Sequence, residues 1–180
     1  MLNGKTAYIL SIDQSTQGTK AILLDGDGRL VLRRDLPHRQ LIHERGWVGH
    51  DAREIAANVL QVARNVIMDS GIDRRRLCAV AVTNQRESVA VWERDTGAPV
   101  CESIVWQCNR AAQLCARIRE AGVAEQVRQR TGLLLSPFFS ASKIAWVLEN
   151  VPGVREKAER GQICAGTMDC WTIWQLTGGR

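Results

Sequence analysis

Residues 7–24 read AYILSIDQSTQGTKAILL, and this stretch decides the fold. The apolar run from Ala7 to Ile12 predicts a buried strand, and Thr19 to Leu24 predicts a second one. The segment between them, Asp13 to Gly18, is made of small and polar residues, which is typical of a turn. We therefore expect a β-hairpin in which the carboxylate of Asp13 lies at the end of the first strand.

The chain that follows extends this hairpin into a mixed sheet. The turn at residues 25–28 (DGDG) precedes a third strand, Arg29 to Arg34, so tight turns join three strands into an antiparallel meander. Asp51 can cap a helix that Gly71 ends. Because the next strand, Leu77 to Thr83, follows a helix, we expect it to lie parallel to the first strand.

Beyond this fourth strand, short strands and helices are interspersed. We expect strands at residues 88–92, 104–106 and 163–165, and helices at residues 108–120, 122–130, 140–149, 154–160 and 169–176. These elements predict an α/β fold, a mixed sheet with flanking helices. The sequence has no internal repeat or obvious linker, and it stops without a closing signal at Arg180. We expect residues 1–180 to form one partial domain.

The composition is that of an ordinary globular protein. Lys and Arg number 24 against 19 acidic residues. They are dispersed, apart from Arg74-Arg75-Arg76, which we interpret as a solvated turn rather than a nucleic-acid patch. After Met1 to Lys5, Asp13 soon interrupts the apolar run, so neither a signal peptide nor a membrane span is predicted. We expect a cytoplasmic protein that binds neither nucleic acid nor membrane.

The six cysteines point to no disulfide or zinc framework. They form no C-x-x-C pair, and no histidine follows at zinc-ligand spacing. Because no secretion signal is predicted, we expect free, buried thiols.

The first chemical motif is Ile12-Asp-Gln-Ser-Thr-Gln-Gly-Thr-Lys20. A turn of this kind can aim several backbone N–H groups at one point, where phosphate oxygens are natural acceptors. The adjacent acid, Asp13, could hold Mg²⁺, usually through water. Taken alone, the motif is more often a plain β-hairpin in which Asp13 caps the turn.

The second motif, Val82-Thr-Asn-Gln-Arg-Glu-Ser88, places two charged residues in an otherwise apolar strand pair. Neighbouring strand residues point to opposite faces, so Arg86 and Glu87 can serve one ligand only if the backbone bends there. Glu87 could accept hydrogen bonds from adjacent hydroxyls while Arg86 donates to an oxygen, which suits a polyol. The competing interpretation, favoured by this motif alone, is an exposed charged hairpin tip.

Two further segments carry aromatic residues. In Ile104-Val-Trp-Gln-Cys-Asn-Arg110 a strand delivers Trp106 to the start of a helix, and an indole face packs well against the C–H side of a carbohydrate. In Thr131-Gly-Leu-Leu-Leu-Ser-Pro-Phe-Phe-Ser140 the proline and the paired aromatics suggest a rigid loop beside the pocket. A core tryptophan and a hydrophobic connection between helices are the alternatives for these two segments.

In this order, the motifs resemble the FGGY family of carbohydrate kinases. The resemblance rests on the Asp13 turn and on four other segments, residues 46–51 (GWVGHD), 83–87 (TNQRE), 104–108 (IVWQC) and 166–171 (GTMDCW). It covers nearly the entire chain and is closest to the glycerol kinases of this family. It implies an actin-like (ribonuclease H-like) ATPase fold with two domains around a cleft, of which this chain would be an incomplete first domain.

The resemblance also implies roles for single residues. Arg86 and Glu87 would bind substrate hydroxyls, Trp106 would pack on the carbon skeleton, and Asp13 would help to hold Mg²⁺. The residues that would touch the ATP phosphates are Thr16, Gln17, Gly18, Thr19 and Lys20. The general base is expected beyond Arg180, so no catalytic base is assigned within the chain.

Two departures from the glycerol kinases bear on the substrate. The aromatic that supplies a hydroxyl to glycerol in typical glycerol kinases is Phe138 here, and phenylalanine can neither donate nor accept that hydrogen bond. The phosphate turn is closer to that of the pentulose and other sugar kinases in the family than to that of the glycerol kinases.

The sequence thus predicts part of an ATP- and Mg²⁺-dependent kinase that phosphorylates a hydroxyl of glycerol or a related polyol or sugar. The alternatives are a pentulose (xylulose-type) kinase of the same family and a non-catalytic polyol-binding fragment. The expected partner is a small polyol or sugar, and a homo-oligomer is allowed. The 180-residue chain alone is expected to be inactive.

Overall fold

The computed structural model describes residues 7–179, which divide into two units. Unit 1 draws on Met1–Arg39, Asp51–Gln85 and Met168–Arg180, and unit 2 on Gln40–His50 and Arg86–Thr167. The predictions about the first five residues and about Arg180 lie outside the described residues. The single partial domain expected from the sequence therefore contains two separately packed parts.

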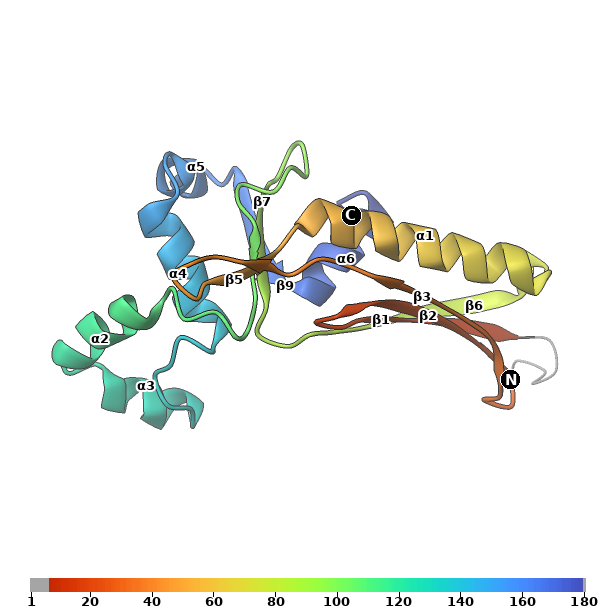
Figure 1. The fold of residues 1–180 in the computed structure, drawn as a ribbon, viewed down its shortest axis with the longest axis horizontal. Coiled ribbons are helices and arrows are strands. Elements are labelled where there is room, and N and C mark those ends of the chain that lie inside the picture. Colours follow the sequence, from red (N-terminus) through yellow and green to blue (C-terminus); the bar gives the residue numbers. More distant parts are fainter. Residues whose placement is uncertain (1–6, 180) are drawn as a thin grey trace. The chain divides into compact units, whose positions relative to one another are not determined.

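Unit 1 is built on a four-stranded sheet with the strand order β3-β2-β1-β6 (Figure 1). The strands are β1 (Tyr8–Gln14), β2 (Gly18–Asp25), β3 (Leu30–Pro37) and β6 (Leu77–Asn84). Strands β1, β2 and β3 pair antiparallel, and β6 pairs parallel to β1. The predicted meander and the predicted parallel fourth strand are both confirmed.

Helices α1 (Ala52–Ser70) and α6 (Met168–Thr177) pack in unit 1, where α1 covers β2 and β3 and also contacts α6. The Asp51 side chain accepts hydrogen bonds from the backbone N–H groups of Arg53 and Glu54, and Gly71 closes the helix with a φ of 66°. Both predicted caps are therefore present. A short 3₁₀ turn, η2 (Arg74–Arg76), has no buried residue, which agrees with the solvated turn expected there.

Unit 2 contains a five-stranded sheet with the order β4-β5-β8-β7-β9. Its strands are β4 (Leu41–Ile42), β5 (Val48–His50), β7 (Val89–Glu93), β8 (Ser103–Ile104) and β9 (Ile163–Thr167). Its helices are α2 (Ala112–Glu120), α3 (Ala124–Thr131), α4 (Ser140–Asn150) and α5 (Val154–Glu159). The sequence predicted neither β4 nor β5, because two or three residues are too few for a periodic signal.

Two predicted boundaries in unit 2 were wrong. The strand expected to reach Trp106 ends at Ile104, and the helix expected from Cys108 begins at Ala112. The intervening residues form turns, in which the Cys108 N–H donates to the carbonyl of Val105. Trp106 therefore belongs to neither β8 nor α2.

A buried arginine organises part of unit 2. The Arg110 side chain is only 3% exposed and pairs with Glu102 at 2.5 Å. Its guanidinium also lies 5.0 Å from the ring centroid of Trp47 and 5.2 Å from that of Trp146. Because the charge is paired and stacked on two aromatic faces, its burial is compensated.

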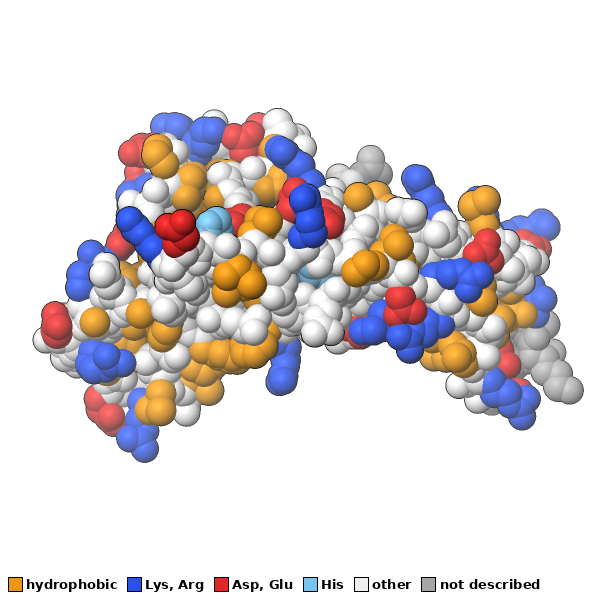
Figure 2. Space-filling view, viewed as in Figure 1, with side chains coloured by type: hydrophobic (Ala, Val, Ile, Leu, Met, Phe, Trp, Pro, Cys, Tyr) orange, Lys and Arg blue, Asp and Glu red, His pale blue; other side chains and the backbone are white. Residues whose placement is uncertain are grey.

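The surface bears out the expected dispersal of charge. On the face shown in Figure 2, basic side chains are interspersed with acidic ones. Among residues 7–179, no helix has the length and apolar character needed to cross a membrane. Cys108 and Cys115 are buried as expected, but Cys78 and Cys170 are exposed, so the prediction of buried thiols was wrong for these two.

The N-cap of α1 gives a test of this fold. Replacing Asp51 by Ala removes the acceptor for two N–H groups of the first turn, so the free energy of unfolding should fall by about 1 kcal/mol. Asp51→Ser should keep most of the stability, because serine also caps well. Urea unfolding of the chain measures both values, and equal stability of Asp51→Ala and the parent chain would contradict the capping role.

Candidate active site

Strand register places a row of polar residues across the unit 1 sheet. Asp13 of β1 lies opposite Lys20 of β2 on one side and opposite Thr83 of β6 on the other. Lys20 in turn lies opposite Asp35 of β3. Directly paired residues share one face of a sheet, so these four side chains lie on the same face.

Asp13 and Lys20 form an ion pair within this row. The Lys20 Nζ donates to Oδ2 of Asp13 at 3.1 Å, and both side chains are about one-third exposed (31% and 35%). The sequence predicted that the turn begins at Asp13, but β1 continues to Gln14, so the acid lies inside a paired strand. The strand pairing therefore fixes the position of the carboxylate more tightly than a turn would.

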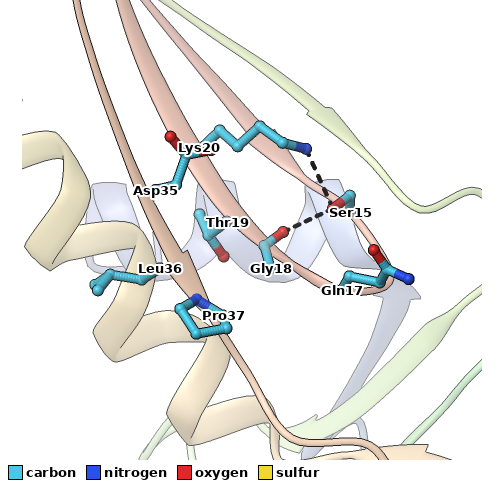
Figure 3. A pocket seen from close by; sticks show the side chains of 8 residues that line it. All are labelled: Ser15, Gln17, Gly18, Thr19, Lys20, Asp35, Leu36 and Pro37. Carbon is cyan, nitrogen blue, oxygen red and sulfur yellow. Dashed lines mark hydrogen bonds between the residues drawn. The ribbon is translucent and has the colours of Figure 1, made fainter.

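The turn itself is closed by Ser15. Its backbone N–H and its hydroxyl both donate to the carbonyl of Gly18, each at 2.9 Å. Lys20 Nζ reaches the Ser15 hydroxyl at 3.4 Å (Figure 3). A pocket of about 250 Å³ lies here, lined by Ser15, Gln17, Gly18, Thr19, Lys20, Asp35, Leu36 and Pro37.

Two glutamines support the turn from the sheet. Gln14 is fully buried, and its side-chain oxygen accepts a hydrogen bond from the Gln85 amide at 3.1 Å. The backbone N–H of Gln85 also donates to the carbonyl of Gln14 at 2.7 Å. The end of β6 is thereby attached to the start of the turn.

The predicted turn residues differ in how they lie. Gln17 is exposed, whereas the Thr19 side chain is buried on the sheet face opposite Lys20. Among the described residues, the Thr19 hydroxyl has no hydrogen-bond partner. A buried hydroxyl without a partner is unfavourable, so this group has capacity for a further acceptor or donor.

The bend inferred at Arg86 and Glu87 is present in unit 2. Both residues lie in a turn, and Glu87 has a φ of 64°, the only positive φ at a non-glycine among residues 7–179. Glu87 Oε2 accepts from the backbone N–H of Ser140 at 2.8 Å and from its hydroxyl at 2.7 Å. The carboxylate is therefore fixed at the first turn of α4, which favours a negative charge there.

Aromatic residues immediately precede Ser140, the residue that holds this carboxylate. The Trp106 ring is edge-on to Phe138 at 6.0 Å between centroids, and Phe138 packs against Phe139 at 5.2 Å. Trp106 and Phe138 are 36% and 41% exposed, so the alternative of a core tryptophan is wrong. Arg86 is exposed and forms no hydrogen bond or ion pair with another described residue.

Sequence reasoning missed Lys143, the other charged group of this cluster. Its side chain is fully buried on α4, and its Nζ donates to the carbonyl of Phe138. A lysine on the apolar stretch of a helix is the signal that could have found it. Residues Glu87, Trp106, Phe138, Ser140 and Lys143 thus form one connected cluster, which we call the Glu87 cluster.

Potential metal ligands do not cluster within the described part of the chain. Among residues 7–179, no three His, Cys, Asp or Glu side chains converge on one point. Asp13 supplies one carboxylate, which pairs with Lys20, a residue that lines the pocket of Figure 3. A single carboxylate completed by phosphate oxygens and water is a common environment for Mg²⁺, so the residue present fits that ion.

Comparison with known structures defines the class of protein. The chain superimposes on 35% of the glycerol kinase of Plasmodium falciparum, in the crystal structure with ADP, with a TM-score of 0.88 and 33% identity over 97% of this chain. A ligand-bound xylulose kinase from Lactobacillus acidophilus gives a TM-score of 0.78 at 21% identity. The fold is that of the actin-like ATPases, as the sequence predicted.

Sequence comparison gives the family. Residues 8–180 match the FGGY family of carbohydrate kinases, N-terminal domain. Glycerol kinase 1 of Thermotoga maritima is 49% identical over 172 residues, and the Bacillus subtilis glycerol kinase is 44% identical over 173. The chain belongs to the FGGY family of carbohydrate kinases. Each of these two matches spans 96% of this chain but only 35% of the relative's length.

The close approach of β3 to the turn gives a second prediction. A Cβ at Gly18 would lie 2.6 Å from the carbonyl oxygen of Leu36, and backbone atoms have little freedom to withdraw. Gly18→Ala should therefore lower the free energy of unfolding by about 1–3 kcal/mol. The control is Gly28→Ala, whose Cβ meets nothing within 4 Å but whose φ is +78°, so it reports conformational strain alone. A smaller loss at Gly18 than at Gly28 in urea unfolding would contradict this packing.

Proposed function

We propose that this chain is the amino-terminal part of an ATP-dependent kinase that phosphorylates a hydroxyl of glycerol or a closely related polyol. The observation that carries the proposal is the Glu87 cluster: a fixed carboxylate beside an exposed pair of aromatic rings. Charged acceptors for hydroxyls and aromatic faces for C–H groups are what a small polyol requires. The identity to glycerol kinases, 49% for one relative, supports this substrate class.

In this proposal the Glu87 cluster orients the substrate. Oε2 of Glu87 is engaged by Ser140, so Oε1 accepts a substrate hydroxyl, while Trp106 covers the carbon skeleton. Arg86, exposed beside Glu87, donates to a second substrate oxygen. Orientation of the acceptor hydroxyl is a large part of phosphoryl-transfer catalysis, because the transition state requires attacking and leaving oxygens in line.

The Asp13 turn would hold the phosphates of ATP. Lys20 and the backbone of residues 16–19 would contact phosphate oxygens in the pocket of Figure 3. Asp13 would hold Mg²⁺ through water. When bound, this ion would neutralise charge that develops on the phosphate oxygens. The general base would come from the part of the parent protein that the relatives have beyond this chain.

A pentulose substrate is the second candidate. Phe138 carries no hydroxyl for glycerol, and the fold similarity extends to xylulose kinases. In either case the parent protein would act in the cytoplasm on a small, soluble substrate.

Kinetics of the full-length parent test the function. With ATP, Mg²⁺ and glycerol it should release ADP, whereas the 180-residue chain should release no more ADP than buffer does.

Glu87→Gln in the full-length parent should lower kcat/KM for glycerol by about tenfold or more, as expected for weakening a hydrogen bond to a charged acceptor. Asp13→Ala should instead lower kcat with little change in polyol binding.

The matched control is Glu93→Gln. Glu93 also lies in unit 2 but pairs with Lys157 at 2.6 Å, away from the Glu87 cluster. This variant should keep the kinetic constants of the parent. If the parent turns over no polyol or sugar, or if Glu93→Gln and Glu87→Gln lose the same activity, the proposed function is wrong.

Substitution of Phe138 separates the two substrate candidates. Phe138→Tyr adds a hydroxyl at the exposed ring that contacts Trp106, so a glycerol kinase should show a lower KM for glycerol. A xylulose-type kinase should instead lose activity towards its pentulose. Steady-state kinetics with both substrates measure this, and Phe139→Tyr serves as the control because it alters the neighbouring ring. Equal effects of the two variants would show that the substrate does not lie against Phe138.

A further inference from the structure

Lys143 is a charged residue to which the proposed function assigns no role. It lies on α4 with none of its surface exposed (0%). Burial of an ammonium group is strongly unfavourable unless hydrogen bonds or opposite charges compensate it. The contacts that compensate the buried charge of Lys143 therefore indicate the role of this side chain.

The first compensating contact is with Phe138. Lys143 Nζ donates to the Phe138 carbonyl and lies 5.8 Å from the centroid of the Phe138 ring. One side chain thus holds both the backbone and the ring of this residue. Because the Phe138 ring contacts Trp106, Lys143 also limits where the aromatic pair can lie.

The second compensating contact is electrostatic. Burial lowers the pKa of Lys143 to about 8, and the negative charge of Glu87 opposes this shift. The other titratable groups that act on it are Cys108, which follows β8, and Cys115 on α2. The positive charge of Lys143 is therefore present at neutral pH and is lost as the pH rises through about 8.

Helix α4 brings these contacts together. Ser140 and Lys143 are three residues apart, so they lie on the same side of the helix. Ser140 holds Oε2 of Glu87 by two hydrogen bonds, and Lys143 supplies a positive charge one turn further along. A rigid helix thus determines both the position of the carboxylate and its electrostatic environment.

We propose that Lys143 is a positioning residue for polyol binding, which holds Phe138 and, through its positive charge, helps to orient the Glu87 carboxylate towards the substrate. This inference rests on the proposed function. It concerns binding of the acceptor rather than transfer of the phosphoryl group, so it should affect KM for the polyol more than kcat.

The pH dependence of the wild-type parent is the first measurement. Between pH about 7 and about 9, KM for glycerol should rise as Lys143 loses its proton, while KM for ATP stays constant. This experiment needs no substitution, so it holds even if a variant at a buried position fails to fold.

Two substitutions complete the test. Lys143→Met has a similar length but no charge or donor, and should raise KM for glycerol by about tenfold at neutral pH. Lys143→Gln keeps a donor but no charge. In both variants KM for glycerol should no longer change between pH about 7 and about 9. Lys157→Met is the matched control, because Lys157 of α5 pairs with Glu93 outside the cluster, and it should retain the wild-type pH profile.

The outcomes separate this inference from the function. If the wild-type parent phosphorylates no polyol, the proposed function fails. If it is active but its KM for glycerol is independent of pH, or the Lys143 variants keep the wild-type profile, then Lys143 has a packing role only and the inference is overturned. A KM that follows the charge of Lys143 in the wild type and not in the variants supports it.

Discussion

Pairing of β1 on both of its edges is the constraint on which unit 1 depends. The strand is antiparallel to β2 and parallel to β6, so its register is fixed twice. Side chains alternate between faces, which buries Ile12 and Gln14 and leaves Asp13 partly exposed. A slip of one residue would bury the carboxylate and expose the core positions. The same pairing that builds the core therefore presents the acid beside the turn.

The end of β6 shows how local strain is offset. Gln85 is hydrogen bonded to Gln14, and two residues later Glu87 adopts a left-handed conformation. Such a conformation costs about 1–2 kcal/mol for a residue with a Cβ. Each hydrogen bond from Ser140 to the Glu87 carboxylate contributes about 1.5–3 kcal/mol, which is enough to offset the strain. Strain of this kind is typical of binding sites.

Unit 2 buries two cations by different means. Arg110 has a carboxylate partner, Glu102, and is stacked on two tryptophan rings, so its charge is compensated and always present. Lys143 has a carbonyl, an aromatic face and a carboxylate that acts on it only electrostatically. Because its pKa is about 8, Lys143 is the one of the two whose charge changes near neutral pH. This difference in how the two charges are compensated fits a structural role for Arg110 and a role in substrate binding for Lys143.

The sequence by itself determined the meander, the capped helix α1, the parallel β6 and the bend at Arg86 and Glu87. These follow from short-range rules: apolar runs, turn residues, caps and the alternation of strand faces. The sequence also singled out Glu87, Trp106 and Phe138 as residues of interest. Their contacts with one another could not be derived from these local patterns, because they come from separate segments.

Tertiary structure alone decided the rest. It placed Asp13 inside β1 rather than in the turn, and Thr19 on the face opposite Lys20, because cross-strand register depends on both partners. It also brought Lys143 of α4 to Phe138 and to the charge of Glu87. Contacts between residues far apart in sequence depend on how helices and strands pack against one another. Local sequence patterns do not specify that packing.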